Sequence, residues 1–180
     1  MRVIVSGIPG VGKSTVIDLV SQRSNYSVKN FGTIMFETAR TMYQINNRDE
    51  MRKLDIKAQI ELQRNAAIEL GKMDNIIIDT HMSIKSPSGY LPGLPEWVLK
   101  ELNISSYFLI EADPDKILTH RLNDPTRIRD NDTEKDIKEH QEINRYYAVA
   151  YSVYSGATVN FIYNPENHPE EAAENILRRL

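Results

Sequence analysis

The chain has 180 residues, 41% of them hydrophobic and 26% charged, with a formal net charge of −3. That length and composition predict one globular domain, and the acidic balance argues against general binding to nucleic acid or to acidic membranes. Cysteine is absent, which excludes disulfide frameworks and thiolate metal sites, and no apolar run approaches the ~20 residues that span a bilayer. We therefore expect a cytoplasmic protein with no obligatory nucleic-acid or membrane partner.

Five short runs are expected to form strands, and most of them are continuously apolar. They are Val3–Ser6, Ser27–Phe31, Asn75–Asp79, Tyr107–Glu111 and Val159–Tyr163. Such runs are typical of a parallel sheet buried on both faces. The segments between them have helical character: one begins at Thr15, and the others cover 48–73, 114–122, 134–155 and 170–180. Strands alternating with helices predict an α/β fold with a parallel sheet.

Two stretches interrupt this alternation. Ser83 to Pro95 contains three prolines and two glycines, which predicts an ordered loop or a lid-like excursion. Asn123 to Thr133 is charged and polar, so we expect it to be exposed.

A phosphate-binding motif follows the first strand. Gly7-Ile8-Pro9-Gly10-Val11-Gly12-Lys13-Ser14 matches G-x-x-x-x-G-K-[ST] in full. Its glycines let backbone N–H groups approach phosphate oxygens, and the helix N-terminus adds positive potential. Lys13 is expected to reach the β- and γ-phosphates, and the Ser14 hydroxyl to bind Mg²⁺.

An acidic residue ends the third expected strand. Asp79 closes the apolar run Asn75-Ile76-Ile77-Ile78. The carboxyl ends of parallel strands are where ligands bind, so we expect Asp79 to help hold Mg²⁺ beside ATP.

The type of P-loop protein depends on the remaining motifs. A GTPase would carry N-K-x-D, which is missing, and a D-x-x-G motif, whose glycine position holds Met82 after Asp79. A small phosphotransferase needs positive charge around the transferred phosphoryl group. Three arginines gather around the polar segment, and a fourth follows on the next helix: Arg121, Arg127, Arg129 and Arg145. For any single arginine the alternative is a surface ion pair.

Further motifs make the chain resemble archaeal adenylate kinases over essentially its whole length. The most specific are Arg48-Asp49-Glu50-Met51-Arg52-Lys53-Leu54 and Gly89-Tyr90-Leu91-Pro92-Gly93-Leu94-Pro95. Asn30-Phe31-Gly32-Thr33, Ile78-Asp79-Thr80-His81 and Asp124-Pro125-Thr126-Arg127-Ile128-Arg129-Asp130 also match.

This resemblance implies Mg²⁺-dependent, reversible phosphoryl transfer from ATP to AMP, giving two ADP. It implies a P-loop NTPase core with a five-stranded parallel sheet, a helical AMP-binding insertion at 30–70 and a short lid at 123–133, in one domain over 1–180. A homotrimer is also implied.

The resemblance further assigns residues to roles. Lys13, Arg127, Arg129 and Arg145 are implied to be catalytic, and Arg121 and Thr15 to join the P-loop residues at ATP. Asn30, Thr33 and Arg52 are the implied AMP contacts, although Thr33 as the N-cap of a helix is the structural alternative. Asn164-Pro165 follows the last expected strand, and we expect it to border the ATP adenine.

One departure concerns the AMP phosphate. Other adenylate kinases carry Asp-Gly-[Phe/Tyr]-Pro-Arg after the third strand, whereas this chain has Asp79-Thr80-His81 and no arginine before Arg121. Lys85 is the candidate substitute, with a solvated loop lysine as the alternative.

Two rival functions stay open at this point. One is a P-loop kinase acting on another nucleoside monophosphate or on a small-molecule hydroxyl. The other is an ATPase that uses nucleotide as a switch for an RNA or protein partner, although the composition shows no basic patch.

Overall fold

The computed structural model describes residues 1–123 and 132–180. A five-stranded parallel sheet in the order β2-β3-β1-β6-β7 forms its centre. The strands are β1 (Arg2–Ser6), β2 (Ser27–Asn30), β3 (Ile76–Asp79), β6 (Ser106–Glu111) and β7 (Thr158–Tyr163). The predicted strands are confirmed within one residue at each end, and with them the parallel α/β architecture.

Eight helices are described. They are α1 (Lys13–Gln22), α2 (Phe31–Tyr43), α3 (Arg48–Arg52), α4 (Ile56–Gly71), α5 (Glu96–Leu102), α6 (Pro114–Leu122), α7 (Glu134–Ser155) and α8 (Pro169–Leu177). Among residues 1–123 and 132–180, none of them combines the length and the apolar character needed to cross a bilayer.

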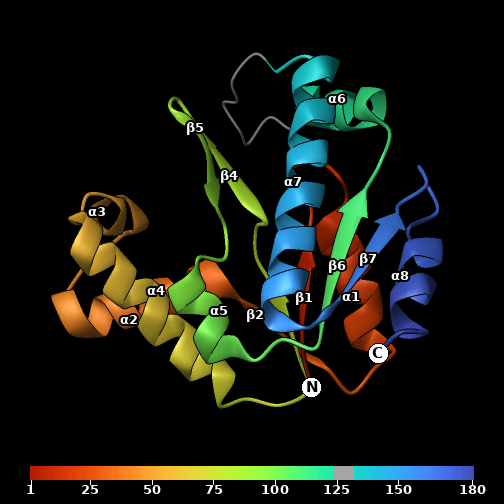
Figure 1. Ribbon diagram of the computed structural model, residues 1–180. Helices are drawn as coiled ribbons and strands as arrows, with labels where there is room; N and C mark the ends of the chain where they lie inside the picture. Colours follow the sequence, from red (N-terminus) through yellow and green to blue (C-terminus); the bar gives the residue numbers. More distant parts are fainter. Residues whose placement is uncertain (124–131) are drawn as a thin grey trace.

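Helices cover both faces of the sheet (Figure 1). Successive side chains of a strand point to opposite faces, so Val3 and Val5 pack with α1 and α8, while Ile4 packs with α4, α5 and α7. The core is therefore two apolar layers with the sheet between them, and the carboxyl ends of its strands are left to carry polar side chains.

The helical region predicted at 48–73 is two helices rather than one. Asp55 interrupts it, because its side chain accepts a hydrogen bond from Ala58 N at 2.9 Å and caps the start of α4. At the start of α2 the N-cap is Asn30, whose Oδ1 accepts a hydrogen bond from Thr33 N at 3.0 Å. The alternative in which Thr33 is the N-cap is therefore wrong.

The proline-rich segment predicted as a loop is a β-hairpin. Strands β4 (Ser83–Ser86) and β5 (Gly89–Pro92) pair in antiparallel fashion. Gly93 ends the hairpin where a Cβ would lie 1.9 Å from the His81 carbonyl oxygen, so only glycine lets the two hairpin ends come this close.

The tyrosines of α7 hold this hairpin in place. Tyr151 is buried, and its hydroxyl donates to Met82 O at 2.8 Å and accepts from Leu94 N at 3.3 Å. Tyr147 donates to Tyr90 O at 3.0 Å. These contacts run from the base of the hairpin toward its tip, so the hairpin lies along α7 (Figure 1).

Candidate active site

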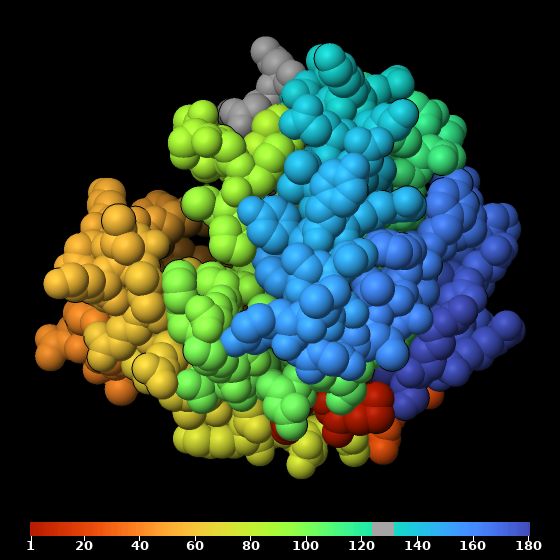
Figure 2. Space-filling view, in the orientation of Figure 1, coloured from red at the N-terminus to blue at the C-terminus, as the bar shows by residue number. Residues whose placement is uncertain are grey.

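A cleft of about 820 Å³ opens at the carboxyl ends of β1, β2 and β3. The P-loop and α6 line one side of it, α2, α3 and α4 line the other, and the base of the β4–β5 hairpin completes it. Figure 2 shows the hollow between the orange helices and the yellow-green hairpin. Its size lies within the range of small-molecule sites.

The P-loop forms the floor of this cleft on the side of β1. Gly10 and Gly12 have φ angles of 90° and 84°, a region that L-residues other than glycine rarely adopt. At Gly12 a Cβ would also lie 2.5 Å from Asn164 Nδ2, so both geometry and contact require glycine there. The loop leads directly into the N-terminus of α1, where backbone N–H groups suit an anion.

Lys13, Asp79 and Asn30 meet at the centre of the cleft. Lys13 forms an ion pair with Asp79 Oδ1, and Asn30 Nδ2 donates to Asp79 Oδ2 at 3.0 Å. Asn30 and Asp79 are register partners on β2 and β3, which is why their side chains reach one another. The sheet thus brings a cation, a carboxylate and an amide together beside the P-loop.

The oxygen donors beside Lys13 suit Mg²⁺. Ser14 and Asp79 both line the cleft, and hydroxyl and carboxylate oxygens are ligands that Mg²⁺ prefers. Among the described residues no group of three or more histidine or acidic side chains could hold a metal by itself. Mg²⁺ there would keep water and phosphate ligands, as is usual for this ion.

Arg121 is fixed next to the P-loop. Its Nε donates to Pro9 O at 2.8 Å, its guanidinium pairs with Asp132, and its side chain is only 8% exposed. Burial lowers the pKa of Arg121, and the neighbouring Asp132 opposes this effect. Arginine is not deprotonated in proteins, so a buried cation lies beside the phosphate-binding loop.

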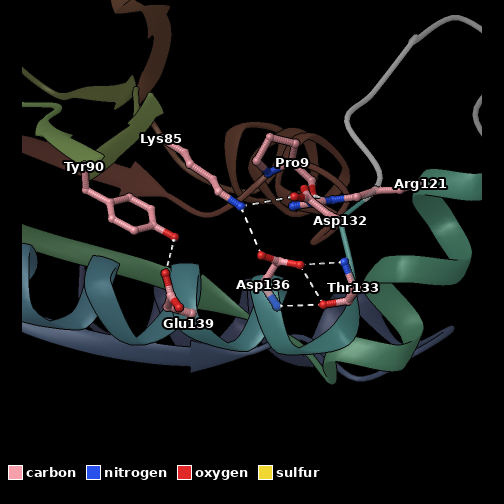
Figure 3. A network of polar contacts seen from close by, with 8 residues as sticks. All are labelled: Pro9, Lys85, Tyr90, Arg121, Asp132, Thr133, Asp136 and Glu139. Carbon is pink, nitrogen blue, oxygen red and sulfur yellow. Dashed lines mark hydrogen bonds and ion pairs between the residues drawn. The ribbon is translucent and has the colours of Figure 1, made fainter. Parts of the chain in front are cut away.

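Asp132 joins Arg121 to the hairpin (Figure 3). Lys85 lies 3.2 Å from Asp132 and 3.4 Å from Asp136. Desolvation lowers the pKa of Lys85, but the two carboxylates outweigh it and the pKa is raised. The structure places Lys85 in this network and not among the residues that line the cleft, because Asp136 of α7 and Asp132, just before the N-cap of α7, hold its ammonium group.

Two arginines of α3 line the acceptor side of the cleft. Arg52, selected from the sequence, pairs with Asp49 at 3.0 Å, and its side chain is 72% exposed. Arg48 donates to Thr33 Oγ1 at 2.9 Å. Sequence reasoning missed Arg48, although it lies four residues before Arg52 and so on the same face of the helix.

Arg145 lies outside the lining of the cleft. Its guanidinium forms a two-bond ion pair with Glu111 and lies 5.0 Å from the centre of the Phe161 ring. Glu111 takes the Nε atom and one of the two terminal nitrogens of Arg145. Arg127 and Arg129 belong to 124–131, outside the described residues. The catalytic roles of these three arginines stay predictions.

A smaller pocket of about 210 Å³ adjoins the P-loop on its other side. Val11, Thr15, Asn164 and Pro165 line it, and Asn164 Nδ2 donates to Val11 O at 2.8 Å. The segment predicted to border the ATP adenine therefore lies next to the phosphate-binding loop, as such a contact requires.

Gln59 and Gln63 of α4 also line the large cleft. Sequence reasoning missed them, since two glutamines one helical turn apart on a polar helix are indistinguishable from solvated residues. Only their tertiary contacts single them out.

Comparison with known proteins identifies relatives along the whole chain. A family model described as an AAA domain matches residues 6–138. The adenylate kinase of Thermoplasma acidophilum is 55% identical over 178 residues, covering 99% of this chain and 97% of the relative. The adenylate kinase of Pyrococcus horikoshii is 46% identical over 183 residues, covering 99% and 92%.

Solved structures agree on the fold. A shikimate kinase from Bacteroides thetaiotaomicron superposes with a TM-score of 0.63 at 12% identity, covering 99% of this chain and 97% of its own. A shikimate kinase from Aquifex aeolicus superposes with a TM-score of 0.57 at 21% identity, covering 99% and 95%. At this identity the likeness concerns the fold alone.

Proposed function

The chain belongs to the adenylate kinase family and carries the AAA domain, and we propose that it transfers the terminal phosphoryl group of Mg²⁺-bound ATP reversibly to AMP, giving two ADP. The observation that carries this proposal is that one cleft has a P-loop on one side and two arginines of α3 on the other. Such a cleft can hold two phosphorylated ligands facing each other, which converts a bimolecular encounter into a positioned reaction.

The donor side would work through charge and position. The P-loop amides would bind the ATP phosphates, and Lys13 would exchange Asp79 for the β- and γ-phosphates. Arg121, already held by Pro9 O, would add positive charge beside them. Mg²⁺, held through Ser14 and Asp79, would supply charge neutralisation at the phosphates.

The acceptor side would use residues of the proposed AMP-binding insertion, 30–70. Asn30 and Thr33 stand where β2 enters α2, and Thr33 Oγ1 accepts from Arg48 at 2.9 Å. Arg48 is therefore added to Arg52 as a candidate for the AMP phosphate, in place of Lys85. The phosphate of AMP is already an anionic nucleophile, so a general base is not needed.

The remaining parts of the proposal rest on the composition of the chain and on its resemblance to archaeal adenylate kinases. We include one kinase domain over 1–180, a short lid at 123–133 that carries Arg127 and Arg129, a trimeric assembly and a cytoplasmic location.

A panel of acceptors tests the function. ADP formation from Mg²⁺-bound ATP is measured with AMP, CMP, UMP, GMP and no acceptor. Fast turnover confined to AMP, and abolished in Lys13→Ala, is expected. Preference for another acceptor would favour a different P-loop kinase, and slow hydrolysis indifferent to every acceptor would favour a nucleotide switch.

A further inference from the structure

Two amide side chains on α4 face the acceptor part of the cleft. Gln59 and Gln63 are four residues apart on one helix, half-buried, and both line the cleft. Residues at this spacing are neighbours on the helix surface. Each amide carries a donor and an acceptor, so what the pair can recognise depends on which atom of each faces inward.

Trp97 decides the orientation of Gln63. The indole Nε1 of Trp97 donates to Gln63 Oε1 at 2.9 Å. An indole N–H can only donate, so it must meet the amide oxygen. The Nε2 group of Gln63 is thereby left as the donor available to a ligand.

Two backbone carbonyls decide the orientation of Gln59 in the opposite sense. Gln59 Nε2 donates to Arg52 O at 3.1 Å and to Leu54 O at 2.8 Å. Carbonyl oxygens only accept, so both amide hydrogens are used at the end of α3. The Oε1 atom of Gln59 is left as the acceptor available to a ligand.

We propose that the hydrogen-bond acceptor of Gln59 and the hydrogen-bond donor of Gln63 together recognise the base of the nucleoside monophosphate that receives the phosphoryl group. Gln59 Oε1 accepts from the exocyclic amino group of adenine, and Gln63 Nε2 donates to its ring nitrogen N1. This assignment rests on the proposed function, because it specifies the base of the nucleoside monophosphate that the cleft takes. Guanine and hypoxanthine present the inverse pattern, an oxygen at position 6 and an N–H at position 1.

The surroundings fit a purine. Phe31, Met35 and Ile84 line the same cleft and supply apolar surface for the faces of the ring. Arg48 and Arg52 line the cleft as well, so the phosphate of the same ligand has cationic partners within the site.

The anchored orientations make the pair selective. To accept an N–H, the Gln63 amide would have to turn over, and its Nε2 group would then face the indole N–H of Trp97. Each mismatched buried hydrogen bond is worth about tenfold in affinity or more. We therefore expect AMP to exceed IMP, which differs only at these two positions, by about 100-fold in kcat/KM.

Gln63→Glu is the sharpest test. A carboxylate still accepts the hydrogen bond from Trp97, but it faces the cleft with an acceptor where the amide has a donor. The AMP to IMP ratio of kcat/KM is expected to fall at least about tenfold, and the AMP to IMP ratio of the dissociation constants measured by calorimetry is expected to rise in parallel. Gln22→Glu makes the same chemical change on the exposed end of α1 and should leave both ratios unchanged.

Trp97→Phe provides a second, uncharged variant. It keeps an aromatic ring against α4 but removes the indole N–H, so the Gln63 amide can turn over. IMP is expected to improve relative to AMP, with the AMP parameters changing less. An AMP to IMP ratio that stays at the wild-type value in both folded variants, with fast AMP turnover, would overturn the assignment and leave the proposed function standing. Failure of every acceptor to yield ADP would overturn the proposed function and the assignment together.

Discussion

Tyr151 is expected to be the main support of the β4–β5 hairpin. Its side chain is 6% exposed, and its hydroxyl bonds both ends of the hairpin, donating to Met82 O at 2.8 Å and accepting from Leu94 N at 3.3 Å. Tyr151→Phe removes one oxygen atom and keeps the ring, so the packing of the core is preserved while two buried backbone groups lose their partner.

The cost follows from those two groups. A buried donor or acceptor left without a partner costs about 1–3 kcal/mol, and the longer bond to Leu94 belongs at the weak end of that range. We expect Tyr151→Phe to lower the free energy of unfolding by about 3 kcal/mol. For a chain of this size that lowers Tm by about 6–12 °C.

Tyr147→Phe is the matched control. Tyr147 lies one turn earlier on α7 and donates a single, partly buried hydrogen bond to Tyr90 O at 3.0 Å. It should cost about 1 kcal/mol. Thermal and urea unfolding of both variants measure the difference. An equal loss of unfolding free energy in the two variants, or a larger loss in Tyr147→Phe, would refute the view that the two hydrogen bonds of the Tyr151 hydroxyl anchor the hairpin.

Three further outcomes are expected. Thr133→Ala removes the side-chain oxygen that caps α7 and should lower the free energy of unfolding by about 1 kcal/mol, which differential scanning calorimetry would detect as a Tm about 2–4 °C lower; an unchanged Tm would contradict the capping role. The hydrogen bonds from Thr133, with Lys85 as a smaller contributor, lower the pKa of Asp136 from 3.8 to about 2. The stability that this carboxylate contributes is therefore present above pH ~4 and lost as the pH falls toward 2. The Tm difference between the wild type and Asp136→Asn should shrink over that interval, and a constant difference would contradict the prediction. Arg127→Ala should lower turnover far more than stability, and a variant that melts early but turns over normally in its folded fraction would exclude a catalytic Arg127.

Much of the fold is encoded locally. The five predicted runs match the strands of the sheet within one residue. The inner strands β1, β3 and β6 are buried along most of their length, and such strands need a continuous apolar stretch. The P-loop could also be predicted from the sequence, since the geometry of phosphate binding, and not packing against distant residues, requires its glycines, Lys13 and Ser14. Helix α7 has the predicted bounds, 134–155, and its end signals are local: the capping box lies at Thr133 and Asp136, and Gly156 ends the helix.

Other features depend on partners far away in the chain. The segment 83–95 has the prolines and glycines of a loop, yet it forms a hairpin, and Tyr147 and Tyr151 of α7 bond its backbone at Tyr90 and Leu94. By its position in the sequence Lys85 was a candidate phosphate ligand, but Asp136 of α7 and Asp132, just before that helix, hold its ammonium group. No local pattern contains that information.

The distinction is sharpest in the cleft. The sequence by itself predicted a phosphate-binding site at Lys13, because a strand, a glycine-rich loop and a helix follow one another there. The meeting of Lys13 with Asp79, 66 residues further along, depends on the parallel pairing of β1 and β3. Only the tertiary structure decided which amide atoms of Gln59 and Gln63 the protein itself engages. Trp97, 34 residues beyond Gln63, bonds one amide, and the carbonyls of Arg52 and Leu54 bond the other. An amide carries a donor and an acceptor of equal size, so the neighbour that folding places against it decides which of the two is left for a ligand.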